Sequence, residues 1–105
     1  MSFYAIVRFE PRHGKTEQFR EELLRVNEPS REEPGCLSLV VYESVHEPIT
    51  FAVHSEWVDE AAFELHAGLA HTVEFLRKAE TLLTHEVRAQ RLRCIGGGRG
   101  AGAGA

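Results

Sequence analysis

The sequence predicts an α+β domain of the ferredoxin-like type, with element order β-α-β-β-α-β and a four-stranded antiparallel sheet. Segments rich in β-branched and aromatic residues predict four strands, at 3–9, 36–45, 50–57 and 85–95. Apolar residues at helical spacing predict the two main helices, from about 15 to 33 and from about 70 to 83. Because β-α-β crossovers are right-handed, both helices are expected on one face of the sheet.

The first strand is apolar on both of its faces. The turn residues Pro11 and Gly14 follow it and connect it to the first helix. That helix carries an apolar stripe at Phe19, Leu23 and Val26. Pro29 is expected to kink or interrupt it, since proline lacks the amide that a helix interior needs. The pair at 34–35, Pro-Gly, is expected to stop it.

The third strand ends on Trp57 and leads directly into a short helix, predicted over 60–67 and ending near Gly68. Asp59 is a suitable N-cap, because its carboxylate accepts a bond from a free amide of the first turn. Val58 and Phe63 have the spacing of a hydrophobic staple, which fixes the angle at which the chain enters the helix. This junction is therefore expected to hold the only tryptophan near His66.

The strands carry more apolar side chains than one covered face can bury. A half-exposed antiparallel sheet normally alternates apolar with polar residues, and two helices cover only one face. An uncovered apolar face of this size is best buried against a second copy, so we expect a homodimer packed sheet to sheet. Two sets of residues can form that face: Ile6, Leu37, Leu39 and Val41, or the opposite set with Cys36, Val40 and Tyr42.

Residues 1–95 are expected to form one domain, and residues 96–105, almost only Gly and Ala, a flexible tail. The net charge of −4 argues against nucleic acid or an anionic membrane as the main partner. No signal peptide and no apolar run of membrane-spanning length is visible. Cys36 and Cys94 fit no metal or redox spacing and are expected to be buried thiols in a reducing cytoplasm.

Two motifs resemble those of a known family. The stretch 33–37, Glu-Pro-Gly-Cys-Leu, is similar to its E-P-G-C-L signature. The stretch from Trp57 to His66 is similar to its W-x-D-x-x-A-F-x-x-H segment, with His71 close behind. The chain, over residues 2 to about 94, thus resembles the antibiotic biosynthesis monooxygenase (ABM) domain, a dimeric α+β barrel. The resemblance implies a dimer with a pocket between the sheet and the helices of each protomer.

The resemblance also implies an activity. Characterised members of that family oxidise quinols or polycyclic phenols with O2 and without metal or flavin, and some relatives bind and degrade haem. The chain departs from the family pattern at three places. Haem-degrading relatives place an Asn where this chain has 5–7, Ala-Ile-Val. Ser55 replaces a frequent Glu, and 69–71, Leu-Ala-His, replaces Thr-Pro-His.

Oxygenation without a cofactor needs an apolar slot for a flat ring, a base, and a group that holds the oxyanion. His66 and His71 are the candidate bases, because imidazole titrates near neutrality. Candidate substrate-binding residues are Trp57, Phe63 and Phe51 for the slot, and Arg91, Ser55 or Tyr42 for the anion. Two structural alternatives stay open: Trp57 as a rim residue of the core, and His66 as a partner of its helix C-terminus.

We expect no metal and no cofactor. His66 and His71 are five residues apart with Gly68 between them, unlike the i, i+4 pair of H-E-x-x-H, and spacing places no third ligand. The leading hypothesis is a cofactor-independent monooxygenase that oxidises an aromatic quinol or phenol with O2. The alternatives are a non-catalytic protein that binds a hydrophobic small molecule in the same fold, or a haem-binding relative.

Overall fold

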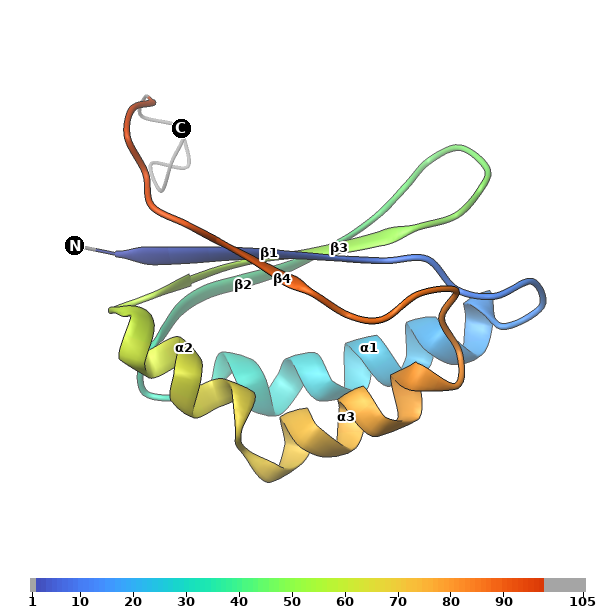
Figure 1. Cartoon of the computed structure of the whole chain (residues 1–105), viewed down its shortest axis with the longest axis horizontal. Coiled ribbons are helices and arrows are strands. Elements are labelled where there is room, and N and C mark those ends of the chain that lie inside the picture. The colour runs from blue at the N-terminus through green and yellow to red at the C-terminus, as the bar shows by residue number, and fades with distance from the viewer. Residues whose placement is uncertain (1, 98–105) are drawn as a thin grey trace.

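The computed structural model describes residues 2–97, and the predicted ferredoxin-like α+β fold is confirmed. Figure 1 shows three helices on one side of a four-stranded sheet. The strands are all antiparallel in the order β2-β3-β1-β4. The elements are β1 (Phe3–Phe9), α1 (Thr16–Arg31), β2 (Cys36–Glu43), β3 (Phe51–Trp57), α2 (Glu60–Ala67), α3 (Ala70–Glu80) and β4 (Ala89–Leu92).

β2 ends two residues earlier than predicted and β3 begins one residue later, and α1, α3 and β4 also differ from the prediction. α1 continues through Pro29 to Arg31, although Pro29 lacks the amide that would bond to the carbonyl four residues earlier. α3 ends at Glu80, and the two leucines that follow, at 82–83, leave the helix to enter the core. β4 pairs with β1 over only four residues, so most of the predicted 85–95 strand is irregular.

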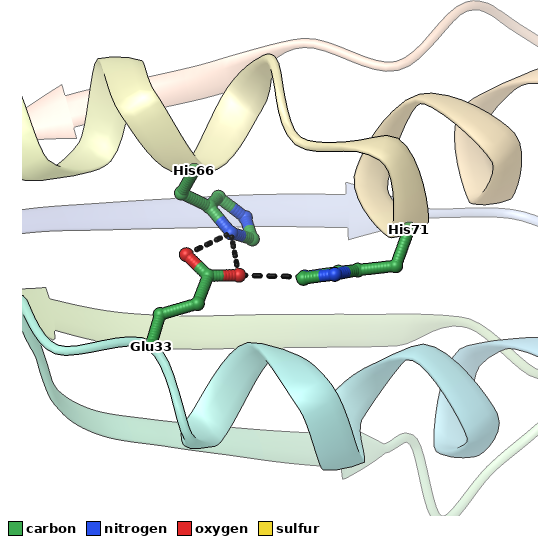
Figure 2. Close-up of side chains that lie close together, drawn as sticks. All are labelled: Glu33, His66 and His71. Atoms are coloured by element: carbon green, nitrogen blue, oxygen red, sulfur yellow. Dashed lines mark hydrogen bonds and ion pairs between the residues drawn. The ribbon is translucent and has the colours of Figure 1, made fainter.

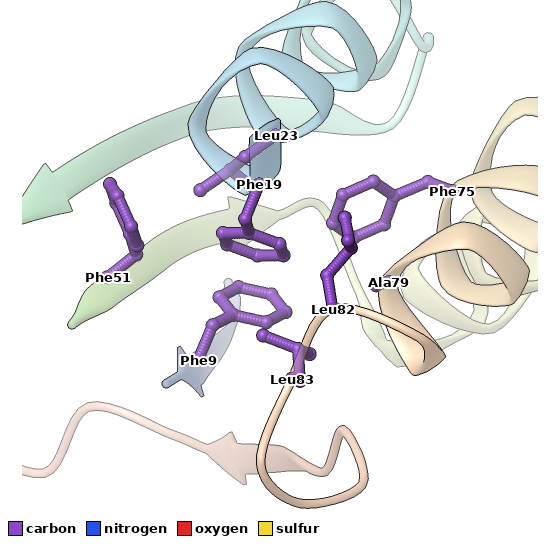
Figure 3. Packing of buried hydrophobic residues seen from close by; sticks show 8 residues of the cluster. All are labelled: Phe9, Phe19, Leu23, Phe51, Phe75, Ala79, Leu82 and Leu83. Carbon is purple, nitrogen blue, oxygen red and sulfur yellow. The ribbon is translucent and has the colours of Figure 1, made fainter. Parts of the chain in front are cut away.

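One end of the inner face is filled by a cluster in which half of the side chains are aromatic (Figure 3). Phe19 is fully buried at its centre, with ring centroids 5.1 Å from Phe9, 5.4 Å from Phe51 and 6.0 Å from Phe75. We call this the aromatic cluster; its members are Phe9, Phe19, Leu23, Phe51, Phe75, Ala79, Leu82 and Leu83.

A smaller cluster lies beneath α2 at the other end of the inner face. It consists of Ala5, Trp57 and Phe63, and we call it the Trp57 cluster. Trp57 is fully buried, and its ring lies 5.8 Å from that of Phe63. Its indole Nε1 is buried without a hydrogen-bond partner among residues 2–97.

A β-bulge decides which residues of β2 face the helices. Between Cys36 and Ser38 the pairing with β3 shifts by one residue, so both Cys36 and Leu39 pack inward against the Trp57 cluster. The expectation that these two side chains lie on opposite faces was wrong, because Leu37 is an extra residue in the ladder. Beyond the bulge, Val41 also packs inward, whereas Val40 and Tyr42 remain exposed on the outer face.

The expectations about the C-terminal tail, membrane-spanning segments and the two cysteines have different outcomes. Most of the predicted Gly/Ala tail, residues 98–105, lies outside the described residues. Within residues 2–97, no helix combines the length and the apolar character that crossing a bilayer requires. Of the two thiols, Cys36 is half-buried but Cys94 is exposed, so the expectation of two buried cysteines was wrong for Cys94.

Candidate functional site

The junction between β3 and α2 forms as its sequence predicts. Asp59 has an extended backbone, and its carboxylate accepts a hydrogen bond of 2.9 Å from the Ala62 amide. This confirms Asp59 as the N-cap of α2. The amide of the preceding residue, Val58, donates to the Gly35 carbonyl at 2.9 Å. The junction is therefore tied to the segment that joins α1 to β2.

Gly35 allows that segment to lie directly against α2. A Cβ atom added to Gly35 would lie only 2.5 Å from the Ala62 Cβ, so any other residue would have to displace the helix. Ala62 and His66 are four residues apart and share one face of α2. The close approach at Gly35 thus brings Glu33, two residues earlier, to His66.

Glu33, His66 and His71 form a hydrogen-bonded cluster (Figure 2). The Glu33 carboxylate lies 2.9 Å and 3.1 Å from Nδ1 of His66, through its two oxygens. Its Oε2 also lies 2.6 Å from Nε2 of His71, in the first turn of α3. The side chains are 10% exposed for Glu33, 16% for His66 and 29% for His71, so the cluster is largely shielded from water.

The carboxylate assigns the tautomers of both rings. An ionised carboxylate only accepts hydrogen bonds, so the ring nitrogen that faces it carries a hydrogen. In a neutral His66 the proton is therefore on Nδ1, and Nε2 carries the free lone pair. Glu33 also fixes the orientation of the ring, as the third group does in a nucleophile–base–carboxylate triad.

A cavity of about 250 Å³ lies between the sheet and the helices, and His66 is part of its wall. Most of the wall is apolar, with Val7, Leu39 and Val53 from the sheet and Leu23 and Phe75 from the helices. The side chains with hydrogen-bonding groups on this wall are Asn27, Ser30, His66, Thr72 and Arg91. The Asn27 Oδ1 is buried and has no hydrogen-bond partner among residues 2–97.

Arg91 brings a cation to the cavity wall from β4. Its guanidinium lies 5.2 Å from the centroid of the Phe63 ring and donates to Glu60 at 2.8 Å. Hydrogen bonds to Glu64 and then to Glu60 raise the pKa of Arg91. The guanidinium is therefore a permanent cation, already shared between two carboxylates.

The structure brings together only part of the predicted site. His66, Phe63 and Arg91 line the cavity, as the sequence suggests for a base, a slot wall and an anion-binding group. His71 contacts Glu33 but is not among the cavity-lining residues. Trp57 lies behind His66, with 4.7 Å between the ring centroids, and supports the imidazole from the core.

The other three predicted residues lie away from the cavity. Phe51 belongs to the aromatic cluster, beside Phe19. Ser55 is buried, and its hydroxyl donates to the Ala5 carbonyl at 3.4 Å. Tyr42 is 54% exposed on the outer face of the sheet.

Glu33, Asn27 and Thr72 belong to the site but were not among the predicted residues. Glu33 is part of the stretch that resembles a family signature, yet it lies 33 residues from its partner His66, and no local pattern links them. Asn27 is one of many polar residues of an amphipathic helix, and such residues are usually solvated. Thr72 gave no signal in the sequence; its Oγ1 lies 3.5 Å from His66 Nδ1.

The sequence profile of the antibiotic biosynthesis monooxygenase (ABM) family matches residues 2–78. The chain belongs to this family. The match includes Glu33, His66 and His71 of the cluster but ends before Arg91.

Relatives of this ABM protein are found among both sequences and solved structures. It is 36% identical over 70 residues to the Bacillus subtilis (strain 168) protein named "Putative monooxygenase YcnE", covering 67% of this chain and 74% of that one. The structure of Rv0793 from Mycobacterium tuberculosis superposes with a TM-score of 0.85 at 26% identity, covering 92% and 98% of the two chains. PA3566 from Pseudomonas aeruginosa gives 0.82 at 29% identity, covering 90% and 95%.

Proposed function

We propose that this ABM protein is a cofactor-independent monooxygenase that oxidises an aromatic quinol or phenol with O2. The observation that carries the proposal is His66, whose ring is oriented by the Glu33 carboxylate at the wall of a mainly apolar cavity. A flat ring needs an apolar slot, and a phenolic hydroxyl needs a base beside it. Membership of the antibiotic biosynthesis monooxygenase family, and the similarity to the protein named "Putative monooxygenase YcnE", support this proposal.

His66 is the proposed base. Its Nε2 accepts the proton of the phenolic hydroxyl, and the adjacent Glu33 carboxylate stabilises the imidazolium that forms. The resulting phenolate is electron-rich and transfers an electron to O2. The polar groups on the same cavity wall, Asn27, Ser30 and Thr72, supply hydrogen bonds to the oxygens of the ring.

The reaction balances without an external reductant. With a naphthoquinol, the superoxide and the substrate radical combine at a ring carbon and form a C–O bond. The peroxide then loses water, so that one oxygen atom remains in a hydroxyquinone and the other leaves as water. The four electrons that O2 accepts come from the quinol and from the C–H bond that becomes C–OH.

Oxygen consumption by metal-depleted protein tests the proposal. Reduced naphthoquinol should be oxidised above the autoxidation blank, and His66→Ala should lower turnover by roughly 10²–10⁴-fold, the usual contribution of general base catalysis. His46→Ala is the matched control, since this exposed histidine lies in the β2–β3 turn. A protein that binds the naphthoquinol but consumes no O2 would contradict the proposal and favour the non-catalytic binding protein.

We also infer that the protein is a homodimer, packed through the outer faces of its sheets. The outer face exposes several large apolar side chains, including Leu37 at 53%, Val40 at 39% and Tyr42 at 54%. Light scattering should give about twice the chain mass of 11.8 kDa. Val40→Asp should yield monomers or unfold the protein, because burying an unpaired charge is strongly unfavourable. Val45→Asp, at a site that is 86% exposed, is the control and should leave the dimer intact.

A further inference from the structure

We propose that the Glu33–His66–His71 cluster binds a divalent transition-metal ion. Histidine spacing alone gives no third ligand, but the fold supplies one from the α1–β2 joint. The candidate ligand atoms of the three side chains all lie within 4.8 Å of one another. Each comes from a different segment, so the site exists only in the folded chain.

The donor set selects the class of metal. Two imidazole nitrogens and one carboxylate oxygen suit Zn²⁺ and its first-row neighbours, whereas Ca²⁺ and Mg²⁺ prefer oxygen ligands throughout. Two His and one Glu also match the three-ligand sets that leave a further position on Zn²⁺ for water or a small ligand. Of the three ligands only His66 lines the cavity, so the ion would lie behind the cavity wall, on the Nδ1 side of the His66 ring.

The geometry needs only side-chain adjustment. Around a tetrahedral ion with bonds of about 2.0 Å, ligand atoms lie about 3.3 Å apart. The Glu33 oxygen now lies 2.9 Å from His66 Nδ1 and 2.6 Å from His71 Nε2, so it has to withdraw by less than about 1 Å. The two imidazoles move toward each other as the ion replaces the N–H hydrogens between them and the carboxylate.

The backbone around the cluster is held in place before any ion binds. Gly35 rests against Ala62, which sets the distance between the α1–β2 joint and α2. Asp59 caps the start of α2, the helix that carries His66. The buried Trp57 ring packs against the His66 ring. Such a rigid frame lowers the conformational cost of assembling three ligands.

Metal binding and the base role of His66 exclude each other. A neutral imidazole has one lone pair, so when Nδ1 binds the ion, the proton resides on Nε2. His66 then has no lone pair to accept a proton from a substrate. This consequence rests on the function proposed above, whereas the binding itself does not. The metal-loaded protein should therefore be the inactive form.

The binding test uses the full untagged chain near neutral pH. Calorimetry with Zn²⁺ and the visible absorption of bound Co²⁺ should both report one ion per chain. Glu33→Gln and His71→Ala should each weaken binding by at least roughly 10- to 100-fold, the loss seen even for groups that only support a ligand. His46→Ala is the control and should bind like the parent. Thermal melting without metal shows whether each variant is folded.

Two results would overturn the site: no saturable Zn²⁺ binding by the parent, or equal binding by the parent and both ligand variants. The exclusion is tested separately, by O2 consumption with reduced naphthoquinol. Added Zn²⁺ should stop turnover and a chelator should restore it; turnover that rises with bound metal would contradict the exclusion. A protein that binds Zn²⁺ but never consumes O2 would support the site and overturn the proposed function instead.

Discussion

At one end of the sheet's inner face, Phe19 is enclosed by other apolar side chains, whereas at the other end Trp57 supports a histidine that faces a carboxylate. Both residues are fully buried. Around Phe19, side chains from α1, α3 and the strands fill the aromatic cluster. Trp57 instead contacts His66 of the Glu33–His66–His71 cluster. The cavity lies between the two ends, lined by Phe9, Leu23 and Phe75 of the aromatic cluster and by Phe63 of the Trp57 cluster. Apolar packing is thus concentrated at one end, and polar chemistry at the other.

The contrast between the two ends shows how a domain of this size accommodates a polar site. A partly buried carboxylate such as that of Glu33 is unfavourable unless hydrogen bonds compensate for its lost hydration. Its contacts with His66 and His71 provide that compensation. These contacts fix the orientation of the three side chains but add little net stability, because the cost of removing the groups from water offsets much of their electrostatic attraction. We therefore expect stability to depend mainly on the aromatic cluster.

The largest expected effect is at Phe19, the residue that would break the packed end. Phe19→Ala should lower the free energy of unfolding by about 3–5 kcal/mol, because it removes a fully buried ring and leaves a cavity. Urea denaturation measures the change. Leu24→Ala on the same helix is the control; its side chain is 50% exposed, so its effect should be much smaller. Equal losses for the two variants would contradict the assignment of the core.

The next effect is at Gly35, which sets the geometry of the polar end. Gly35→Ala should destabilise the fold by about 1–3 kcal/mol, the usual range for an overpacked contact, since its Cβ would collide with Ala62. It should also move Glu33 away from His66 and so change turnover and metal binding. Ala62→Gly in the same chain should restore part of both, although glycine itself weakens α2. If the stability losses of Gly35→Ala and Ala62→Gly simply add in the double variant, the contact between residues 35 and 62 is not the cause of the destabilisation.

The smallest effect is expected at Asp59, which fixes the start of α2. Asp59→Ala should cost about 1 kcal/mol, because the Ala62 amide loses its acceptor. Asp59→Asn retains an acceptor oxygen and serves as the control, with a loss of only a few tenths of a kcal/mol. Thermal melting of both variants measures the difference. If alanine and asparagine behave alike, the cap contributes nothing to holding this end.

Features that depend on neighbouring residues could be predicted from the residue pattern. β1 and α2 begin and end where the residue pattern places them, and the cap at Asp59 forms as predicted. The element order follows from local patterns, and the placement of the helices on one face of the sheet follows from the handedness of crossovers. The pairing of a base with an apolar wall was visible because Phe63 and His66 share one short helix.

Which distant groups meet depends on how the whole chain packs. Glu33 reaches His66 because Gly35 packs against α2, and nothing local to either residue encodes that approach. The bulge at Leu37 sets which side chains of β2 face inward, and an extra residue in a ladder is read only from its partner strand. Residues far apart in sequence meet where packing of the whole chain is most favourable, so their contacts become visible only once the chain has folded.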